Sequence, residues 1–149
     1  MPMNFRPAVL ADFDYCQRPY FAGMAGIIHE LQLKRENQIA SFRRQWDAAQ
    51  VRIITLSGAD IGWLQSTTKN DSLFLAQLFV DACFQRRGLG TEVMHRLLAE
   101  AASSNQPLTL EVVKTNPAKR LYERLGFRIT GEDERKFHMR RDPMPPSAN

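Results

Sequence analysis

A glycine-containing turn between an apolar strand and an amphipathic helix constrains this chain more than any other segment. Residues 73–80 (Leu-Phe-Leu-Ala-Gln-Leu-Phe-Val) predict a largely buried strand. From Thr91 to Ala102 the apolar side chains recur at helical spacing. The turn itself contains Gln85, Arg86, Arg87, Gly88, Leu89 and Gly90. A strand that leads through such a turn into a helix favours an α/β fold.

The turn has the features of an anion-binding site. The first N–H groups of a helix have no partner within the helix, and the helix dipole is positive there. Gly88 and Gly90 lack a Cβ, so a ligand can approach the backbone closely. Arg86 and Arg87 add charge that can pair with phosphate. Together these features predict a site for a diphosphate.

Two common nucleotide-binding motifs do not fit the turn. The dinucleotide fingerprint requires a third glycine where Val93 stands. A P-loop requires a Gly-Lys-Ser/Thr ending, and Gly90-Thr91-Glu92 lacks the lysine. Residues 85–90 are too short a motif to exclude the alternative, an ordinary structural turn with two solvated arginines.

A second segment carries independent information. Residues 108–113 alternate apolar side chains with Thr109 and Glu111, as a strand does. Asn116 suits a helix N-cap and Pro117 the first helical position. Gly126 suits the left-handed residue that ends a helix. A short helix with a marked beginning and end is therefore expected after this strand.

The two segments resemble the GNAT superfamily of acyl-CoA-dependent N-acetyltransferases. Residues 85–90 match its Gln/Arg-x-x-Gly-x-Gly/Ala signature. Residues 116–127 resemble its Asn-x-x-Ala-x-x-Leu-Tyr-x-x-x-Gly-Phe segment, although Asn116 and Tyr122 stand one residue closer together than in many members. The resemblance implies an α/β fold with a mixed central sheet of about six to seven strands and helices on both faces. It also implies a single N-acetyltransferase domain over residues 1–142, followed by a disordered tail at 143–149.

The resemblance further implies transfer of an acetyl group from acetyl-CoA to a primary amine of a small molecule or peptide, by direct attack. A catalytically silent domain that binds acyl-CoA as a sensor or structural ligand is the alternative. Acetyl-CoA is the implied co-substrate, with its pyrophosphate on the glycine turn and its thioester oxygen near a backbone N–H of the preceding strand. The implied co-substrate contacts are Phe79, Val80, Gln85, Arg86, Arg87, Gly88, Leu89, Gly90, Thr91, Asn116 and Lys119.

Two residues are implied as catalytic. Tyr122 aligns with the tyrosine that protonates the coenzyme A thiolate, the alternative being a core aromatic. Glu111 aligns with a strand glutamate that acts as general base, and an ion-paired surface glutamate is the alternative. Gln77 stands where many relatives have an acidic residue, and since it cannot accept a proton it would orient a water or the substrate. The expected acceptor contacts are Tyr20, Met24 and Gln77.

Composition limits the possible partners. The formal net charge of +4 favours an anionic co-substrate, while no zinc spacing or aromatic-interleaved basic run points to nucleic acid. The histidines and Cys16 and Cys83 show no metal-ligand or redox spacing, so we expect no metal and a cytoplasmic location. No apolar run could span a membrane, and the N-terminus lacks the apolar core of a signal peptide. The resemblance is compatible with a homodimer.

The remaining segments complete the expected order of elements. A first strand is expected over residues 4–9, and two helices between Asp12 and about Ala48, with interruptions near Pro19 and Gly23. Residues 51–56 and 61–67 predict one hairpin, and residues 127–130 and 136–140 predict a closing one.

Overall fold

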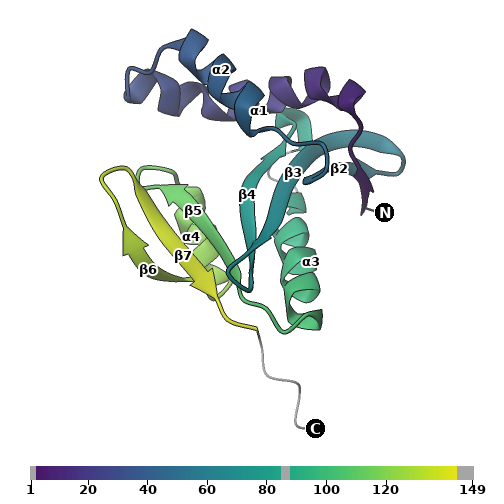
Figure 1. The fold of residues 1–149 in the computed structure, drawn as a ribbon, viewed down its shortest axis with the longest axis vertical. Coiled ribbons are helices and arrows are strands. Elements are labelled where there is room, and N and C mark those ends of the chain that lie inside the picture. The colour runs from purple at the N-terminus through teal and green to yellow at the C-terminus, as the bar shows by residue number, and fades with distance from the viewer. Residues whose placement is uncertain (1–2, 85–87, 144–149) are drawn as a thin grey trace, which may run out of the picture. The chain divides into compact units, whose positions relative to one another are not determined.

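The computed structural model describes residues 3–84 and 88–143 (Figure 1). Its strands are β1 (Met3–Pro7), β2 (Val51–Leu56), β3 (Ala59–Lys69), β4 (Ser72–Val80), β5 (Leu108–Val113), β6 (Arg128–Glu132) and β7 (Lys136–Arg141). Its α-helices are α1 (Phe13–Glu30), α2 (Arg35–Gln45), α3 (Leu89–Ser103) and α4 (Ala118–Arg124). Two short 3₁₀ helices are η1 (Leu10–Asp12) and η2 (Ala82–Phe84). The predicted tail beyond Pro143 lies outside the described residues.

Over the described residues the strands form one mixed seven-stranded sheet in the order β1-β2-β3-β4-β5-β7-β6. β4 and β5 run parallel and pair over residues 73–75 and 108–110. β1 with β2, β2 with β3, β5 with β7, and β6 with β7 are antiparallel. A parallel pair needs a crossover connection, and α3 provides it. The predicted α/β class with a mixed sheet is confirmed.

The described residues group into two compact units. The first consists of residues 3–65 and 77–84, and the second of residues 66–76 and 88–143. β3 and β4 contribute residues to both units. β4 is less buried than the sequence predicts, because only Ser72 and Leu75 are buried and Ala76 is exposed.

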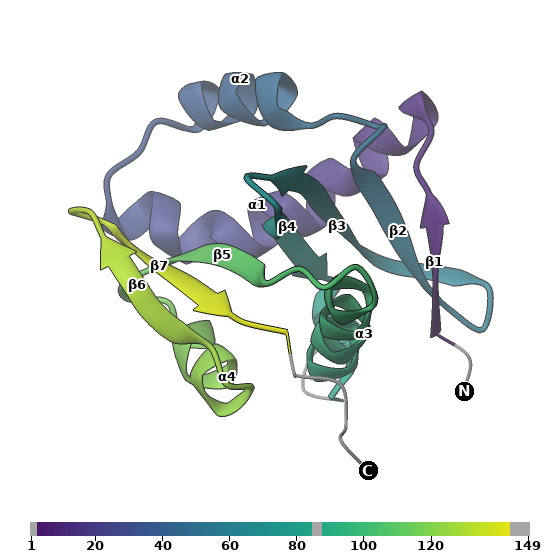
Figure 2. The same cartoon turned by 60° about the horizontal axis from the view of Figure 1, so that its bottom comes forward.

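In the first unit, α1 and α2 cover one face of β2 and β3 (Figures 1 and 2). Trp63 of β3 is fully buried under them. Its indole Nε1 donates to the carbonyl of Cys16 in α1 at 3.0 Å, and its ring meets Phe42 of α2 edge-on at 5.9 Å. Replacing a core aromatic of this kind by alanine costs about 3–5 kcal/mol. Trp63 therefore anchors both helices to the strands.

Helix α1 runs without a break through Pro19 and Gly23, so the predicted interruptions at these residues are wrong. The break before α2 falls instead at residues 31–34. Pro19 has no N–H and removes one helical hydrogen bond. Pro19 and Tyr20 are nevertheless buried, and the packing of a helix face outweighs such a local cost.

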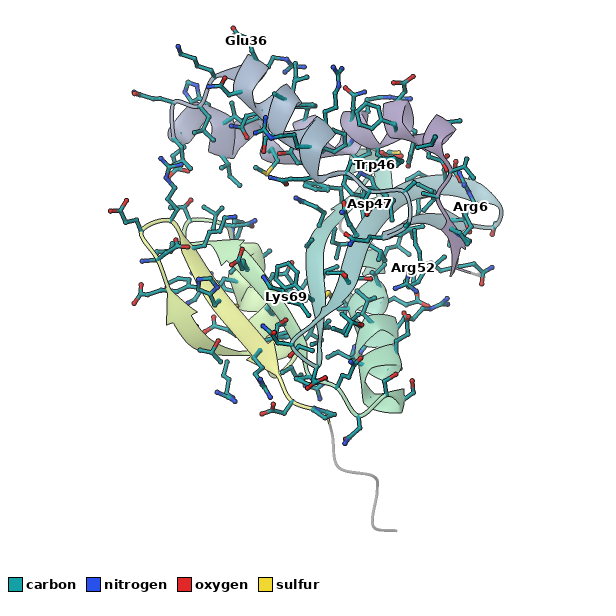
Figure 3. The ribbon with its side chains drawn as sticks, viewed as in Figure 1. Arg6, Glu36, Trp46, Asp47, Arg52 and Lys69 are labelled. Atoms are coloured by element: carbon teal, nitrogen blue, oxygen red, sulfur yellow. The ribbon has the colours of Figure 1, made fainter. Side chains whose placement is uncertain are left out.

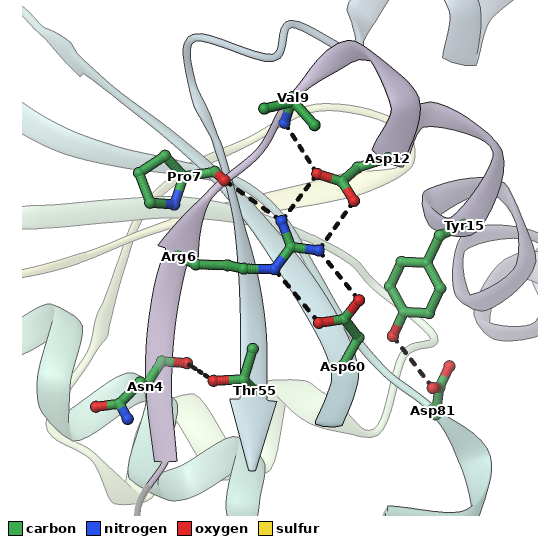
Figure 4. A network of polar contacts seen from close by, with 9 residues as sticks. All are labelled: Asn4, Arg6, Pro7, Val9, Asp12, Tyr15, Thr55, Asp60 and Asp81. Carbon is green, nitrogen blue, oxygen red and sulfur yellow. Dashed lines mark hydrogen bonds and ion pairs between the residues drawn. The ribbon is translucent and has the colours of Figure 1, made fainter. Parts of the chain in front are cut away.

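Arg6 of β1 joins three elements of the first unit (Figure 4). Its Nη2 lies 2.9 Å from Asp12 Oδ1 and 3.0 Å from Asp60 Oδ2. Asp12 Oδ2 also accepts the Val9 N–H at 2.9 Å. The Arg6 guanidinium holds the pKa of the Asp12 carboxyl below its usual value. The residue before α1 is thus tied to β1 and to the start of β3.

Two further contacts of aromatic rings lie in the same unit, and Figure 3 labels one partner of each, Arg52 and Trp46. The Arg52 guanidinium carbon is 5.1 Å from the ring centroid of Phe5 on the adjacent strand, within the range of a cation–π contact. Trp46, directly after α2, meets Phe13 edge-on at 5.4 Å. These contacts attach β1 to β2 and the end of α2 to the start of α1.

The second unit contains α3, β5, α4, β6 and β7. The apolar face of α3 is buried as predicted, at Val93, Met94, Leu97 and Ala101. Figure 2 shows α4 against one face of β5, β7 and β6. The predicted closing hairpin is present, with slightly different bounds. β6 begins one residue later than predicted and ends two residues later, at Glu132, and β7 ends one residue later, at Arg141. Boundary differences of this size are common at strand ends.

Candidate active site

The N-terminus of α3 carries the described part of the predicted phosphate-binding turn. Gly88 is the N-cap, with φ +75° and ψ 7° in the left-handed region that glycine adopts without steric cost. The Glu92 N–H donates the first helical hydrogen bond, to the Gly88 carbonyl at 3.0 Å. The N–H groups of residues 89–91 therefore have no carbonyl partner within the helix. Residues 85–87 of the predicted turn lie outside the described residues.

The glycines of this turn border open space. A Cβ added at Gly88 or Gly90 would meet no atom of the described structure within 4 Å. An anion can consequently approach the backbone N–H groups of the first turn, where the helix dipole is positive. Leu89 and Thr91 of the same turn are half-buried. The chemistry of this helix end fits a phosphate or diphosphate group.

Asn116 caps the beginning of α4. Its Oδ1 accepts the Ala118 N–H at 2.9 Å, and its carbonyl accepts the Lys119 N–H at 3.2 Å. The predicted positions are each one residue too early, because Pro117 is the N-cap and Ala118 the first helical residue. The Asn116 side chain nevertheless accepts a hydrogen bond from the first helical N–H. Because Oδ1 is engaged in the cap, the amide nitrogen is the side-chain group that could contact a co-substrate, and this contact stays a prediction.

Tyr122 lies near the end of α4, where the helix closes with a Schellman motif. The Phe127 N–H donates to the Tyr122 carbonyl and the Gly126 N–H to the Glu123 carbonyl, both at 3.0 Å. Gly126 has φ +93°, which confirms the predicted left-handed helix end. The Tyr122 and Phe127 rings lie 5.8 Å apart. Burial raises the pKa of the Tyr122 phenol, so the hydroxyl holds its proton at neutral pH.

Lys119 is engaged by neighbours within the second unit. Its Nζ lies 3.5 Å from Glu123 Oε1 and 5.1 Å from the ring centroid of Phe137. Lys114 approaches the same ring at 5.3 Å and pairs with Glu132. Each lysine thus has a carboxylate beside it. A co-substrate phosphate would compete with Glu123 for Lys119, whose predicted contact stays a prediction.

Glu111 lies on β5 with its side chain 34% exposed. Its Oε2 is 3.0 Å from His138 Nδ1, and its Oε1 is 3.9 Å from Lys136 Nζ. An open hollow of about 370 Å³ borders it, lined by Glu111 and residues 133–136. The position lets a substrate amine reach the carboxylate. Glu111 also has the contacts with His138 and Lys136 that an ion-paired surface glutamate would have. Its role as general base therefore stays a prediction.

His138 lies beside Glu111, a contact that the sequence did not predict. β5 and β7 pair in a register that sets His138 directly opposite Glu111. On its other side, Nε2 of His138 lies 3.6 Å from Asp133 Oδ2. Asp133 Oδ1 accepts the N–H groups of Arg135 and Lys136, both at 2.8 Å, and these bonds lower the pKa of Asp133. The register of two strands distant in sequence was the missing information.

The predicted acceptor contacts lie in the first unit. Tyr20 is only 4% exposed and packs against Phe42 and Phe79, so it is a core residue in this structure. Met24 and Gln77 are half-buried. The amide Nε2 of Gln77 lies 3.5 Å from Gln45 Oε1 at the end of α2. Substrate contacts by Tyr20, Met24 and Gln77 stay predictions.

Phe79 and Val80 were both predicted near the thioester oxygen. The Phe79 ring packs against Trp63, with centroids 5.5 Å apart. The Phe79 carbonyl faces Gly62 of β3, and the Asp81 N–H donates to β3 at 2.7 Å. Backbone groups alternate in direction along a strand, so the Val80 N–H is directed away from β3. The contact of either backbone N–H with the thioester oxygen stays a prediction.

No group of three or more His, Cys, Asp or Glu side chains in the described part of the chain has an arrangement that could hold a metal ion. None of the helices there is both long and apolar enough to cross a membrane.

Comparison with known proteins identifies the class. A family model described as "Acetyltransferase (GNAT) domain" matches residues 29–145, which is most of the chain. The chain therefore belongs to the GNAT acetyltransferase family, and the predicted resemblance is confirmed. Among curated proteins none matches the chain.

Solved structures of the same fold include proteins from archaea and bacteria. PH1933 from Pyrococcus horikoshii OT3 is 15% identical, with a TM-score of 0.76 and coverage of 97% of this chain and 100% of the other. The PaiA N-acetyltransferase from Thermoplasma acidophilum, in complex with coenzyme A, is 14% identical, with a TM-score of 0.69 and coverages of 95% and 99%. The ribosomal-protein-S18-alanine N-acetyltransferase from Escherichia coli is 20% identical, with a TM-score of 0.68 and coverages of 99% and 98%. At these identities the similarity demonstrates a common fold.

Proposed function

We propose that this protein transfers an acetyl group from acetyl-CoA to a primary amine of a small molecule or peptide. Membership of the GNAT acetyltransferase family supports the acyl-transfer class. The observation that carries the proposal is the beginning of α3, where the left-handed Gly88 precedes a helix turn that borders open space. This is the backbone arrangement that binds the phosphates of a nucleotide-like co-substrate.

The names of two structural relatives support the proposed acetyl donor and the proposed acceptor amine. One relative was solved in complex with coenzyme A, which supports coenzyme A thioester as the donor. Another is named as a ribosomal-protein-S18-alanine N-acetyltransferase, which supports a peptide amine as one possible class of acceptor. Acetyl-CoA brings the activated acetyl group as a thioester.

Each proposed catalytic group has one task in a direct attack. The Glu111 carboxylate accepts the proton that the amine nitrogen releases as the C–N bond forms. The backbone N–H of Val80 stabilises the negative charge on the thioester oxygen. The Tyr122 hydroxyl donates its proton to the thiolate as the C–S bond breaks, and the raised pKa of this phenol keeps that proton in place until then.

A calorimetric titration with acetyl-CoA tests the proposal at its base. The wild type should bind saturably, whereas Gly88→Glu should lose at least about tenfold in affinity, because it adds a carboxylate and a strained left-handed side chain at the phosphate site. Gly58→Glu is the matched control. Gly58 also has a positive φ (+87°) and open space around its Cβ position, but it lies in the β2–β3 turn. Gly58→Glu should bind as the wild type does.

Turnover separates the enzyme from a silent acyl-CoA-binding domain. A panel of small amines, polyamines and peptide N-termini should be assayed by mass spectrometry of the acetylated product. Thiol reagents are unsuitable because Cys83 is exposed and would react. Binding with acetylation of at least one amine class supports the proposal. Binding without any turnover would favour the sensor alternative, and no binding by a folded wild type would overturn both.

A further inference from the structure

We propose that His138 is a positioning residue for Glu111 that also receives, through Glu111, the proton released by the attacking amine. This inference rests on the proposed acetyl transfer and adds a residue to it. It is carried by one observation in the second unit: the imidazole lies between the carboxylates of Glu111 and Asp133, and both of these residues line the open hollow.

The geometry fixes both sides of the imidazole. His138 and Glu111 are opposed in the β5–β7 register, and Nδ1 lies 3.0 Å from Glu111 Oε2. Nε2 faces Asp133 Oδ2 at 3.6 Å. Asp133 is itself held by two backbone N–H groups of the turn. The imidazole thus has one nitrogen beside the Glu111 carboxylate and the other on the side of the Asp133 carboxylate.

The exposure of Glu111 explains why a partner is useful. A carboxylate becomes a base near neutral pH mainly when burial disfavours its charged form, and the Glu111 side chain is one-third exposed. Histidine is the side chain whose ordinary pKa, about 6.5, lies closest to neutrality. A carboxylate–imidazole pair can therefore retain a proton at a pH at which a solvated carboxylate would release it.

The proton balance requires no further reactant. The amine N–H bond breaks as the O–H bond to Glu111 forms. The neutral His138 that takes part in this step carries its hydrogen on Nε2, on the side of Asp133, and has a lone pair on Nδ1. The O–H bond of Glu111 then breaks as an N–H bond forms at Nδ1, giving an imidazolium whose Nε2–H points to Asp133. The Asp133 side chain is 56% exposed, so the proton can leave to water from this end.

The surroundings of the pair are mixed in charge. Lys136 of β7 lies 3.9 Å from Glu111, and the turn adds Glu134 and Arg135 to the lining of the hollow. On the β6 side, His138 is paired with Gly131, whose added Cβ would sit 3.8 Å from the imidazole Cδ2, and the Thr130 hydroxyl donates to the His138 carbonyl at 3.3 Å. Lys136 is the charged group besides His138 that faces Glu111, and it is included in the test for that reason.

Two substitutions of His138 separate positioning from proton transfer. His138→Asn places a side-chain amide near the Nδ1 position and His138→Gln one near the Nε2 position, but neither amide can accept a proton at these pH values. We expect both variants to lose about 100-fold in kcat at neutral pH, the usual contribution of a proton acceptor. Their KM for acetyl-CoA should be unchanged, and the rate should continue to rise with pH where the wild type levels off. Added imidazole should restore part of the rate of His138→Ala.

Controls address folding and charge. Thr130→Val removes the hydroxyl that contacts the His138 backbone but leaves the ring in place, and it should keep the wild-type rate and pH profile. Lys136→Gln removes a charge and should change kcat less than about threefold, because no proton acceptor is lost. Acetyl-CoA binding by calorimetry verifies that each variant is folded.

The outcomes distinguish this inference from the function on which it rests. Wild-type kinetics and pH profile in His138→Asn would overturn the proton-receiving role, since the asparagine amide cannot accept a proton. A wild type that binds acetyl-CoA but acetylates no amine would overturn the proposed function, and this inference with it. An active wild type with inactive, imidazole-rescued His138 variants would support both.

Discussion

The hydroxyl of Tyr15 donates a hydrogen bond to the carboxylate of Asp81 at 3.2 Å, and this bond ties helix α1 to the residue that follows β4 (Figure 4). The Asp81 N–H donates to the Ile61 carbonyl of β3 at 2.7 Å, and its carbonyl accepts the Phe84 N–H at 2.9 Å. Asp81 is thus held by a helix, a strand and the 3₁₀ turn η2. Within the first unit, these contacts fix the chain at the point where β4 ends.

Removing this hydroxyl should cost stability. We expect Tyr15→Phe to lower the free energy of unfolding by about 1–2 kcal/mol, because a half-buried bond to a carboxylate is lost. Urea denaturation at neutral pH measures the change. Asp81→Asn retains an acceptor oxygen and should lose less. A double-mutant cycle with no coupling between Tyr15 and Asp81 would show that the bond contributes nothing.

Gly62 of β3 is required by the close approach of β4. A Cβ at this position would overlap the Phe79 carbonyl oxygen and lie 2.9 Å from Val80 Cα, both backbone atoms that cannot rotate away. Gly62→Ala should therefore destabilise the protein by about 1–3 kcal/mol through overpacking, measured by thermal denaturation. Because Val80 is the proposed oxyanion contact, kcat should fall as well.

Gly26→Ala is the matched control for this change. Gly26 lies within α1, and an added Cβ there meets nothing within 4 Å among the described residues. Alanine is the better helix former by about 0.8–1.0 kcal/mol, so this variant should be slightly more stable than the wild type. Equal destabilisation of the two variants would contradict the steric explanation for Gly62.

The segments predicted correctly from the sequence are those whose determinants are local. The ends of α4 follow from Asn116 and Gly126, since capping and the left-handed stop involve only neighbouring residues. The buried face of α3 likewise follows from the spacing of its apolar residues. The predicted interruption at Pro19 was wrong because the continuity of α1 depends on packing against residues far away in the chain.

The candidate site was predictable to a smaller extent. Glu111 and Tyr122 were singled out through the family resemblance rather than through any physical pattern. The contact of His138 with Glu111 was not predicted, because it depends on which residues of β7 pair with β5. A shift of one residue would turn the imidazole to the other face of the sheet, and alternation within β7 alone does not determine that register.

The buried Cys16 thiol makes stability depend on pH in the alkaline range. The side chain is fully buried, and desolvation raises its pKa from 9.0 to about 12. The neutral thiol therefore contributes its full stability below pH 9, and this contribution is lost as the pH rises from there towards 12. The loss is limited to about 1.4 kcal/mol per pH unit.

Comparison with Cys16→Ala isolates this contribution. The alanine variant should be less stable at neutral pH, by about 1 kcal/mol, because buried volume is lost. The difference should shrink as the pH is raised from 9 to 10, since only the wild type has a thiol to ionise. Burial raises the pKa of Tyr15 and Tyr20 in both proteins, so most of their contribution cancels in the difference. A constant difference across this range would rule out the buried thiol as the cause.

Tyr122→Phe tests the proposed acid. The phenylalanine ring retains the packing against Phe127, so acetyl-CoA affinity and stability should stay close to those of the wild type, while kcat falls by about 100-fold for want of a proton donor. Burial raises the pKa of the Tyr122 phenol, so the wild-type rate should decline only above pH 10, and the variant should lack this alkaline decline. Tyr15→Phe is the matched control, because it removes one hydroxyl from a residue outside the proposed chemistry and should lower stability but not kcat. Wild-type turnover in Tyr122→Phe would leave the thiolate to take its proton from water and would assign this tyrosine to packing alone.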